Sequence, residues 1–263
     1  MSNPTTTIIT LSKTPELWAR LDLALAPQVD VLASLGIEIE RILVNNTRDL
    51  DFTAAALRSG WMVVEPGYNT SYSIGHNMAV RASAGSRLLL LNDDLIPRPD
   101  FLYQMLQPGA EVVGALLLNN DGTVNHAGTM MAPDGRTDHI GRGSPAEDWQ
   151  GCCHGGYCMA PAATFAAVRI SKALWDTVGG LDEQYYYGWE DTDFCIRAMQ
   201  AKARIQINHR AVATHNECGT RPRGGMHDTT NYNLFTKRWT AALPGILADY
   251  KDRAGSSKLL GMY

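Results

Sequence analysis

The sequence predicts an α/β fold in which helices flank a mostly parallel central sheet. Three observations lead to this prediction. Strand-like and helix-like segments alternate through the first half of the 263-residue chain, residues 87–91 (RLLLL) are almost entirely apolar, and polar residues follow several of the strands. Alternating strands and helices favour right-handed crossovers between parallel strands. An unbroken apolar run is typical of a strand that is buried on both faces.

The first half of the chain supplies most of this alternation. Residues 5–12 (TTTIITLS) and 37–46 (IEIERILVNN) predict strands. Residues 14–36 between them predict a helix that is interrupted at Pro27 and closed by Gly36. A short helix in 51–60, a strand in 61–66, a loop in 67–77 and a helix in 78–85 then lead to the apolar strand.

The pattern changes after residue 110. Residues 111–118 (EVVGALLL) predict one more strand, and residues 123–143 predict a hairpin around Pro133-Asp134-Gly135. A helix after Trp189 and a strand pair ending at His215 follow. No low-complexity linker separates the halves. We therefore expect a nucleotide-binding half (1–110) and a catalytic, acceptor-side half (111–263) that share one sheet within a single domain.

Composition excludes several classes of function. The net charge of −4 and the short basic stretch at 221–225 (RPRGG) give no electrostatic footprint for nucleic acid. No apolar run approaches a membrane span, and the N-terminus lacks the features of a signal peptide, so we expect a soluble, cytoplasmic protein. Cys152, Cys153 and Cys158 lack paired zinc-ligand spacing, which favours reduced thiols over a structural zinc site.

The apolar strand ends in three polar residues, Asn92, Asp93 and Asp94. The carboxyl ends of strands are where open α/β sheets place their ligands. Two adjacent carboxylates repel each other unless a positive group lies beside them, and a divalent metal is the obvious candidate. The alternative is a polar turn before Pro97 and Pro99.

Other strands also end in polar residues, among them Asn45, Asn46 and Glu65. Each could cap a turn or a helix, but several such ends along one sheet edge favour a shared ligand cleft. The sequence contains neither GxGxxG nor GxxxxGK[ST]. A metal would therefore have to bind the phosphates of a nucleotide.

A second acidic group lies in residues 179–197 (GGLDEQYYYGWEDTDFCIR). Glu190, Asp191 and Asp193 occupy the first turn of the predicted helix, where negative charge also suits the helix dipole. Together with Asp182 and Glu183 they exceed what a helix cap needs. We assign at least one of them a chemical role.

These motifs resemble those of the GT-A-fold inverting glycosyltransferases of family 2, which use nucleotide-diphosphate sugars. NDD follows a buried strand, GGLDEQYYYGWEDTDFCIR follows at the right distance, and a later strand ends in ATH. The resemblance extends to NTSYSIGHNMAV and VNHAG. A further segment, NYNLFTKRW, is similar to the corresponding segment of rhamnosyltransferase-like members of the family. The resemblance covers residues 5–240 and implies a GT-A-type fold with a smaller acceptor-side subregion.

The resemblance implies roles for single residues. Asp94 and His215 match metal ligands, and Asp191 matches the general base. Asn92 replaces the first aspartate of the usual DxD motif, Asp93 would lie near the ribose or diphosphate, and Asn46 matches a base-contacting position. Oxygen ligands favour Mg²⁺ or Mn²⁺, and the imidazole favours Mn²⁺.

Further residues complete the predicted site. Trp189, Glu190 and Asp182 would line the donor-sugar or acceptor pocket, although a structural turn also explains Asp182. Residues 216–228, with Arg221 and Arg223, would fold over the diphosphate as a lid; the alternative is a solvated loop.

The predicted function is transfer of a hexosyl or deoxyhexosyl group, with inversion, to the hydroxyl of a glycan or other acceptor. Uridine- or thymidine-linked donors are expected first, and a homodimer is an open expectation. A metal-dependent nucleotidyltransferase would need a phosphate loop after the first strand, where only Lys13 is basic. A non-catalytic nucleotide-sugar-binding protein should lack Asp94 or Asp191, and both are present.

Overall fold

The computed structural model describes residues 5–150, 156–215 and 226–254. Strands and helices alternate along the chain as predicted for its first half. The elements are β1 (Thr6–Ser12), α1 (Pro15–Ser34), β2 (Ile39–Asn45), α2 (Leu50–Arg58), β3 (Met62–Val64), α3 (Tyr72–Ala82), β4 (Arg87–Leu91), β5 (Leu95–Pro97), α4 (Phe101–Leu106), β6 (Val112–Leu118), β7 (Val124–His126), β8 (Thr129–Met131), β9 (Thr137–His139), α5 (Glu147–Gln150), β10 (Tyr157–Met159), β11 (Ala167–Ser171), α6 (Lys172–Val178), α7 (Glu190–Gln200), β12 (Ile205–His215), α8 (Met226–Trp239) and α9 (Leu243–Ala254).

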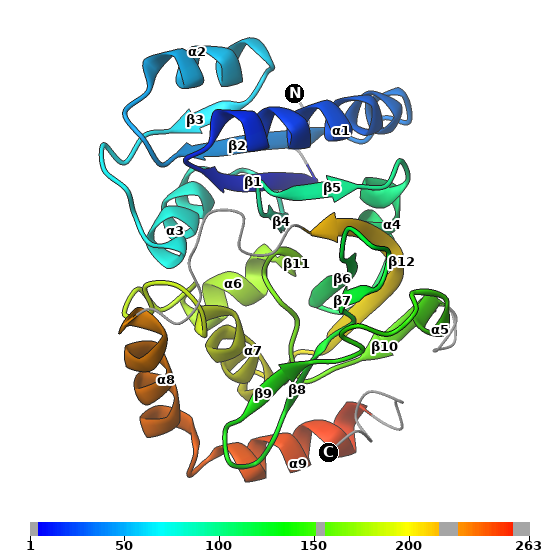
Figure 1. The fold of residues 1–263 in the computed structure, drawn as a ribbon, viewed down its shortest axis with the longest axis vertical. Coiled ribbons are helices and arrows are strands. Elements are labelled where there is room, and N and C mark those ends of the chain that lie inside the picture. The colour runs from blue at the N-terminus through cyan, green and yellow to red at the C-terminus, as the bar shows by residue number, and fades with distance from the viewer. Residues whose placement is uncertain (1–4, 151–155, 216–225, 255–263) are drawn as a thin grey trace.

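The central sheet is mixed and mostly parallel, as predicted (Figure 1). Its strands follow the order β10-β12-β6-β11-β4-β1-β2-β3, while β5 pairs with β12 and β7 with β6. The neighbours of β1 and the β6–β12 pair are parallel, whereas β11 runs antiparallel between β4 and β6. Strands from both halves of the sequence thus share one sheet, and the division at residue 110 stays a prediction.

The four leucines of β4 are buried because helices cover both faces of the sheet. Leu88 and Leu90 pack in the cluster that includes α3, α6 and α7, and Leu89 and Leu91 pack in the cluster that includes α1, α2 and α4. All four are fully inaccessible to solvent. Burial of each leucine contributes about 1.5–3 kcal/mol. The strand that leads into the Asn92–Asp94 turn is thereby anchored in the core.

Two helix boundaries differ from the predictions. α1 continues through Pro27, which lies on the exposed face, where water can bind the Leu23 carbonyl that loses its donor. α3 begins at Tyr72 rather than at residue 78, because the Ser71 hydroxyl accepts a hydrogen bond from the Ile74 N–H (3.2 Å).

Two strand predictions can also be compared with the structure. The hairpin around residues 133–135 is confirmed as the antiparallel pair β8–β9, with Gly135 at φ 88° in its turn. The predicted strand pair before His215 is instead one strand, β12. A β-bulge between Asn208 and Val212 shifts its register against β6, and the two strands pair in parallel on both sides of the bulge.

The cysteines correct one expectation. Cys158 is disulfide-bonded, so the prediction of a reduced thiol is wrong at this position. Cys195 in α7 is a buried free thiol. Cys152, Cys153 and Cys218 lie outside the described residues. Among the described helices, none combines the length and apolar character needed to cross a membrane.

Candidate active site

Asp94 and His215 come together at the carboxyl end of the sheet. The short strand β5 pairs antiparallel with β12, and Leu95 lies opposite His215 in this register. The preceding residue, Asp94, therefore places its Oδ1 atom 3.3 Å from His215 Nε2, with both side chains about nine-tenths buried. The structure thus brings together the two residues that the family resemblance implies as metal ligands.

The pair has the chemistry of a partial metal site. Asp94 Oδ1 and His215 Nδ1 are buried and make no hydrogen bond with the described part of the chain. Neighbouring ligands of an octahedral cation, bound at about 2.1 Å, lie about 3.0 Å apart, which is close to the observed 3.3 Å. No group of three His, Cys, Asp or Glu side chains suited to a metal occurs among the described residues. Mg²⁺ and Mn²⁺ sites of this kind take further ligands from substrate phosphates and water.

Asp93 occupies the same turn and is stabilised differently. Its Oδ2 accepts a hydrogen bond of 2.6 Å from the hydroxyl of Ser12, which ends the neighbouring strand β1. Burial raises the pKa of Asp93 to about 6; the charge of Asp94 adds to this rise, and the Ser12 hydrogen bond opposes it. A cation beside the turn would stabilise the charged form. One serine at a strand end carries no motif, so the sequence alone does not indicate Ser12.

Asn46 is engaged in internal hydrogen bonds. Its Nδ2 donates to Asn69 Oδ1 (2.9 Å) and Thr70 O (3.1 Å), and its Oδ1 accepts from the Thr70 N–H (2.7 Å) and hydroxyl (3.0 Å). The amide therefore holds the loop before α3 against the end of β2. A contact between Asn46 and a nucleobase stays a prediction.

Asp191 lies in the first turn of α7, as predicted. The Thr192 N–H donates to its Oδ1 (2.7 Å). Burial raises the pKa of Asp191, while the Thr192 N–H, His139 and the Phe165 N–H act in the opposite direction. A carboxylate with a raised pKa is a better proton acceptor near neutral pH than an exposed aspartate.

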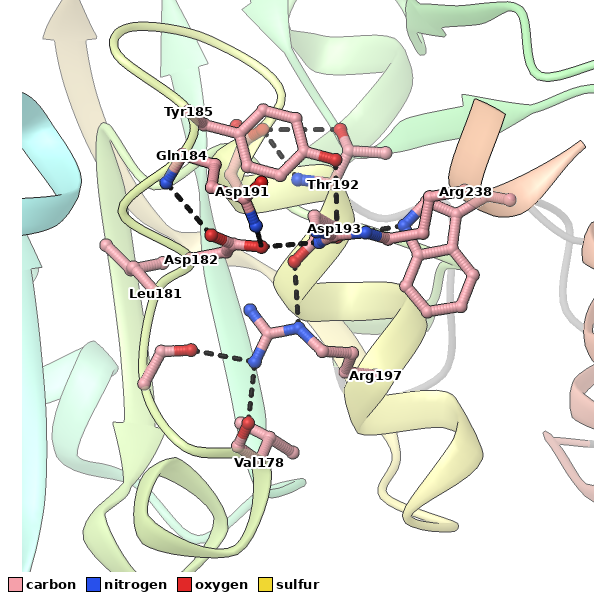
Figure 2. A network of polar contacts seen from close by, with 12 residues as sticks. Val178, Leu181, Asp182, Gln184, Tyr185, Asp191, Thr192, Asp193, Arg197 and Arg238 are labelled. Carbon is pink, nitrogen blue, oxygen red and sulfur yellow. Dashed lines mark hydrogen bonds and ion pairs between the residues drawn. The ribbon is translucent and has the colours of Figure 1, made fainter. Parts of the chain in front are cut away.

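Asp193 serves a structural purpose (Figure 2). It is fully buried, and its oxygens accept hydrogen bonds from Arg197 (2.8 Å), Arg238 (2.9 Å) and Trp239 (2.8 Å). Arg197 also donates to two backbone carbonyls, those of Val178 and Gly180. These bonds attach α7 to the preceding loop and to α8.

Asp182 belongs to the same network. Arg238 Nη1 donates to Asp182 Oδ2 (2.5 Å) and to Asp193 Oδ1 (2.9 Å), so it links the two carboxylates. Asp182 also lines a cavity of about 630 Å³ beside Gly179 and Gly180. Its place in the ion-pair network supports the structural alternative, and a role in a sugar pocket stays a prediction.

Helix α8 holds the loop that leads into α7. The Asn231 amide donates to the carbonyls of Tyr187 (2.7 Å) and Gly188 (3.0 Å). Trp189 then packs on Phe235 with ring centroids 4.5 Å apart. Trp189 has φ 74°, an unfavourable value for a residue with a large side chain, so this packing compensates for backbone strain. The NYNLFTKRW motif thus positions the segment before Asp191.

The other predicted residues are placed as follows. Glu190 is buried beside Asp191, and its charge contributes to a raised pKa of Tyr72, whose largest cause is burial. Asn92 donates its backbone N–H to the Ala166 carbonyl (2.8 Å). Arg221, Arg223 and the rest of the predicted lid up to residue 225 lie outside the described residues.

Comparison with curated proteins gives partial matches. The chain is 32% identical over 172 residues to the uncharacterized protein y4gI of Sinorhizobium fredii, covering 60% of this chain and 18% of that protein. It is 24% identical over 198 residues to the low-salt glycan biosynthesis hexosyltransferase Agl10 of Haloferax volcanii, covering 68% and 59%. It is 23% identical over 169 residues to the O-antigen biosynthesis protein RfbC of Myxococcus xanthus, covering 57% and 12%. The chain thus spans less than two thirds of each of these relatives, and no family model matches it.

Solved structures match over most of the chain. GalNAc-T7, crystallised with UDP, GalNAc and Mn²⁺, superposes with a TM-score of 0.68 at 12% identity, covering 90% of this chain and 48% of that one. The mannosyltransferase PcManGT of Pyrobaculum calidifontis, in complex with GDP-Man and Mn²⁺, gives 0.57 at 14% identity, covering 97% and 77%. The chain therefore has the GT-A fold of glycosyltransferases, which the family 2 resemblance predicts.

Proposed function

We propose that this chain transfers a sugar from a nucleotide-diphosphate sugar to an acceptor hydroxyl, with inversion and with the help of a divalent metal. The observation that carries the proposal is the Asp94–His215 pair, in which Asp94 Oδ1 lies 3.3 Å from His215 Nε2 at the carboxyl end of the sheet. Asp191 supports it, because its raised pKa suits a base. Named relatives and neighbours, including Agl10 and PcManGT, are sugar transferases.

Asp94 and His215 would hold the cation, Mn²⁺ or Mg²⁺. When bound, the cation would neutralise the charge that develops on the departing nucleoside diphosphate. Asp193, Arg197 and Arg238 hold α7 in place and thereby orient Asp191. Asp191 would accept the proton of the acceptor hydroxyl as its oxygen attacks the anomeric carbon. A single displacement inverts the configuration, and a positioned base contributes about 10²–10⁴ in rate.

The donor and acceptor classes are also part of the proposal. A uridine- or thymidine-linked hexose or deoxyhexose is the proposed donor; the two structural neighbours described above contain UDP and GDP-Man. A glycan is the proposed acceptor, because Tyr186 and Tyr232 are more than a third exposed near Trp189, which precedes Asp191 by two residues. Aromatic rings offer apolar faces that suit the apolar faces of sugar rings. Arg223 as a diphosphate contact, a homodimer and a cytoplasmic location stay predictions.

A thermal-shift panel of nucleotide sugars, each with and without Mn²⁺, tests the proposal. A cognate donor should raise the melting temperature by mass action, and the rise should require the metal. Incubation with that donor should then release a nucleoside diphosphate. Release of pyrophosphate would instead indicate a nucleotidyltransferase, and binding without any turnover, across a panel of glycan acceptors, would indicate a non-catalytic binding protein.

A further inference from the structure

A short backbone segment, Thr164–Ala166, connects the candidate metal site to the candidate base. The side chains and backbone groups that its residues meet come from four separate parts of the chain. The Thr164 N–H donates to His126 Nε2 (3.2 Å), the Phe165 carbonyl accepts from the Tyr72 hydroxyl (2.7 Å), and the Ala166 carbonyl accepts from the Asn92 N–H (2.8 Å). The Phe165 ring packs on Phe194 of α7, the helix that carries Asp191, and the Phe165 N–H lowers the pKa of Asp191.

This segment lies beside both chemical centres. Asn92 begins the turn that carries Asp94, and α7 carries Asp191, the candidate base. Asn92 hydrogen-bonds to this segment, and α7 packs on it three residues after Asp191, so both centres are anchored to the same short stretch of backbone. The Phe165 ring anchors this segment in the core by an edge contact with Phe194 of α7, at 5.3 Å between centroids. The relative position of the metal turn and the base therefore depends on this segment.

His126 acts on the segment as a neutral acceptor. It is fully buried, and burial lowers its pKa well below the usual value. Because its Nε2 accepts the Thr164 N–H, the ring proton must be on Nδ1. A protonated imidazole could not accept this bond. His126 thus satisfies a backbone donor next to the base rather than exchanging protons itself.

Tyr72 acts on the same segment as a donor from helix α3. Its ring stacks on His76, one helical turn later, at 3.9 Å between centroids, which restricts the direction of the hydroxyl. Burial first, and then the charges of Glu190 and Asp191, raise the pKa of Tyr72 well above its usual value. The hydroxyl therefore stays protonated and able to donate to the Phe165 carbonyl.

We propose that Tyr72 and His126 are positioning residues, which hold Asp191 at a fixed place relative to the Asn92–Asp94 turn by fixing the backbone of Thr164–Ala166. This inference rests on the proposed function, in which Asp191 is the base. It assigns a purpose to one partly buried and one buried polar side chain, Tyr72 and His126, whose own hydrogen bonds go to neither the metal turn nor the base side chain.

Several titratable groups surround Asp191 and bear on its pH dependence. Glu190 lies on the same helix, Tyr72 comes from α3, His139 from β9, and Cys195 from the next turn of α7. A looser Thr164–Ala166 segment would weaken the Phe165 N–H interaction, which favours the charged carboxylate. The pKa of Asp191 would then rise further, and activity would be lost at a higher pH on the acidic side.

The experiment compares Tyr72→Phe, His126→Leu and His126→Gln with the parent protein. Tyr103→Phe is the matched control, because Tyr103 is 52% exposed on α4. Turnover with the donor found by the thermal-shift panel, its pH profile, and the affinities for UDP, dTDP and GDP with Mn²⁺ are measured for each. We expect Tyr72→Phe and His126→Leu to lower turnover about 10- to 100-fold, because small misplacements of a base are costly. In these two variants the acidic limb of the pH profile should move to higher pH, while the nucleotide affinity should stay within a few-fold of that of the parent. His126→Gln keeps a hydrogen-bond acceptor and should recover most of the turnover.

Crystal structures of Tyr72→Phe and His126→Leu supply a second readout that needs no activity. The Asp191 carboxylate should shift relative to Asn92 in both variants. An unmoved Asp191, or turnover that falls only in proportion to the loss of folded protein with an unchanged pH profile, would overturn the inference. A parent that binds no nucleotide and transfers no sugar refutes the proposed function instead, and the crystal structures then still decide whether the segment positions Asp191.

Discussion

His215 Nε2 lies 3.3 Å from Asp94 Oδ1, although the two residues are far apart in the sequence. The contact depends on one short antiparallel pairing, in which Leu95 of β5 lies opposite His215 of β12. Asp94 Oδ1 and His215 Nδ1 are buried and make no hydrogen bond with the described residues, and a buried polar atom without a partner lowers stability by about 1–3 kcal/mol. The pair is therefore the place to test for metal dependence.

Asp94→Ala is expected to abolish sugar transfer and Mn²⁺-dependent nucleotide binding while leaving the fold intact. The substitution removes a metal ligand at a strand end and little packed apolar area. Isothermal titration with UDP and Mn²⁺, activity and melting temperature would be compared with those of Asp30→Ala, a control on the exposed face of α1. Full activity of the parent after exhaustive chelation would refute a metal role.

Asp191→Asn is expected to lower turnover by about 10²-fold or more, with nucleotide affinity nearly unchanged. Asparagine keeps the size of aspartate but cannot accept the proton. Steady-state kinetics and nucleotide titration measure the two quantities separately. Turnover within a few-fold of the parent would assign the base elsewhere, with the neighbouring Glu190 as the next residue to substitute.

The dependence of the parent protein's activity on pH should show the titration of Asp191. Only the charged carboxylate accepts a proton, so activity should be lost as pH falls through the pKa of Asp191. Burial raises that pKa, so the loss should occur at a higher pH than an ordinary aspartate, with a pKa of about 3.9, would give. A profile of kcat/KM against pH measures this limb, and a flat profile down to pH 4 would contradict the assignment.

Asp193→Ala is expected to lower the free energy of unfolding by about 3–5 kcal/mol, because it leaves arginine charges without their buried partner. Urea denaturation measures the change. Asp249→Ala is the matched control: Asp249 pairs with Lys202 and Arg253, but its side chain is 45% exposed, so the expected loss is much smaller than for Asp193→Ala. Equal losses in the two variants would show that the Asp193 network is not a stabilising core feature.

Tyr232→Ala is expected to raise the KM for a glycan acceptor about 10-fold without changing the affinity for nucleotide, because it removes an exposed ring next to Trp189. Initial rates at varied acceptor concentration give the KM. Tyr103→Ala, an exposed tyrosine on α4, controls for the loss of a surface ring. An unchanged acceptor KM would place the acceptor away from this aromatic surface.

Local sequence predicted much of the fold and part of the site. The strand at 87–91, the polar turn after it and the acidic helix start at Glu190 all follow from short-range patterns, namely apolar runs and residue types near helix ends. The predicted helix break at Pro27 is wrong, because the proline lies on the exposed face of α1 and the helix continues through it. The predicted helix start at residue 78 is also wrong, because the Ser71 cap starts α3 at Tyr72.

The sequence by itself determined which residues could do chemistry: two acidic motifs, a histidine at a strand end, and an apolar strand to carry the first motif. Only the tertiary structure decided how they are used. The β5–β12 pairing places His215 beside Asp94, Arg238 makes Asp193 a structural residue, and internal hydrogen bonds occupy the Asn46 amide. The physical reason is that a polar side chain takes its role from the partners and the burial it meets, and these come from segments that are distant in the sequence.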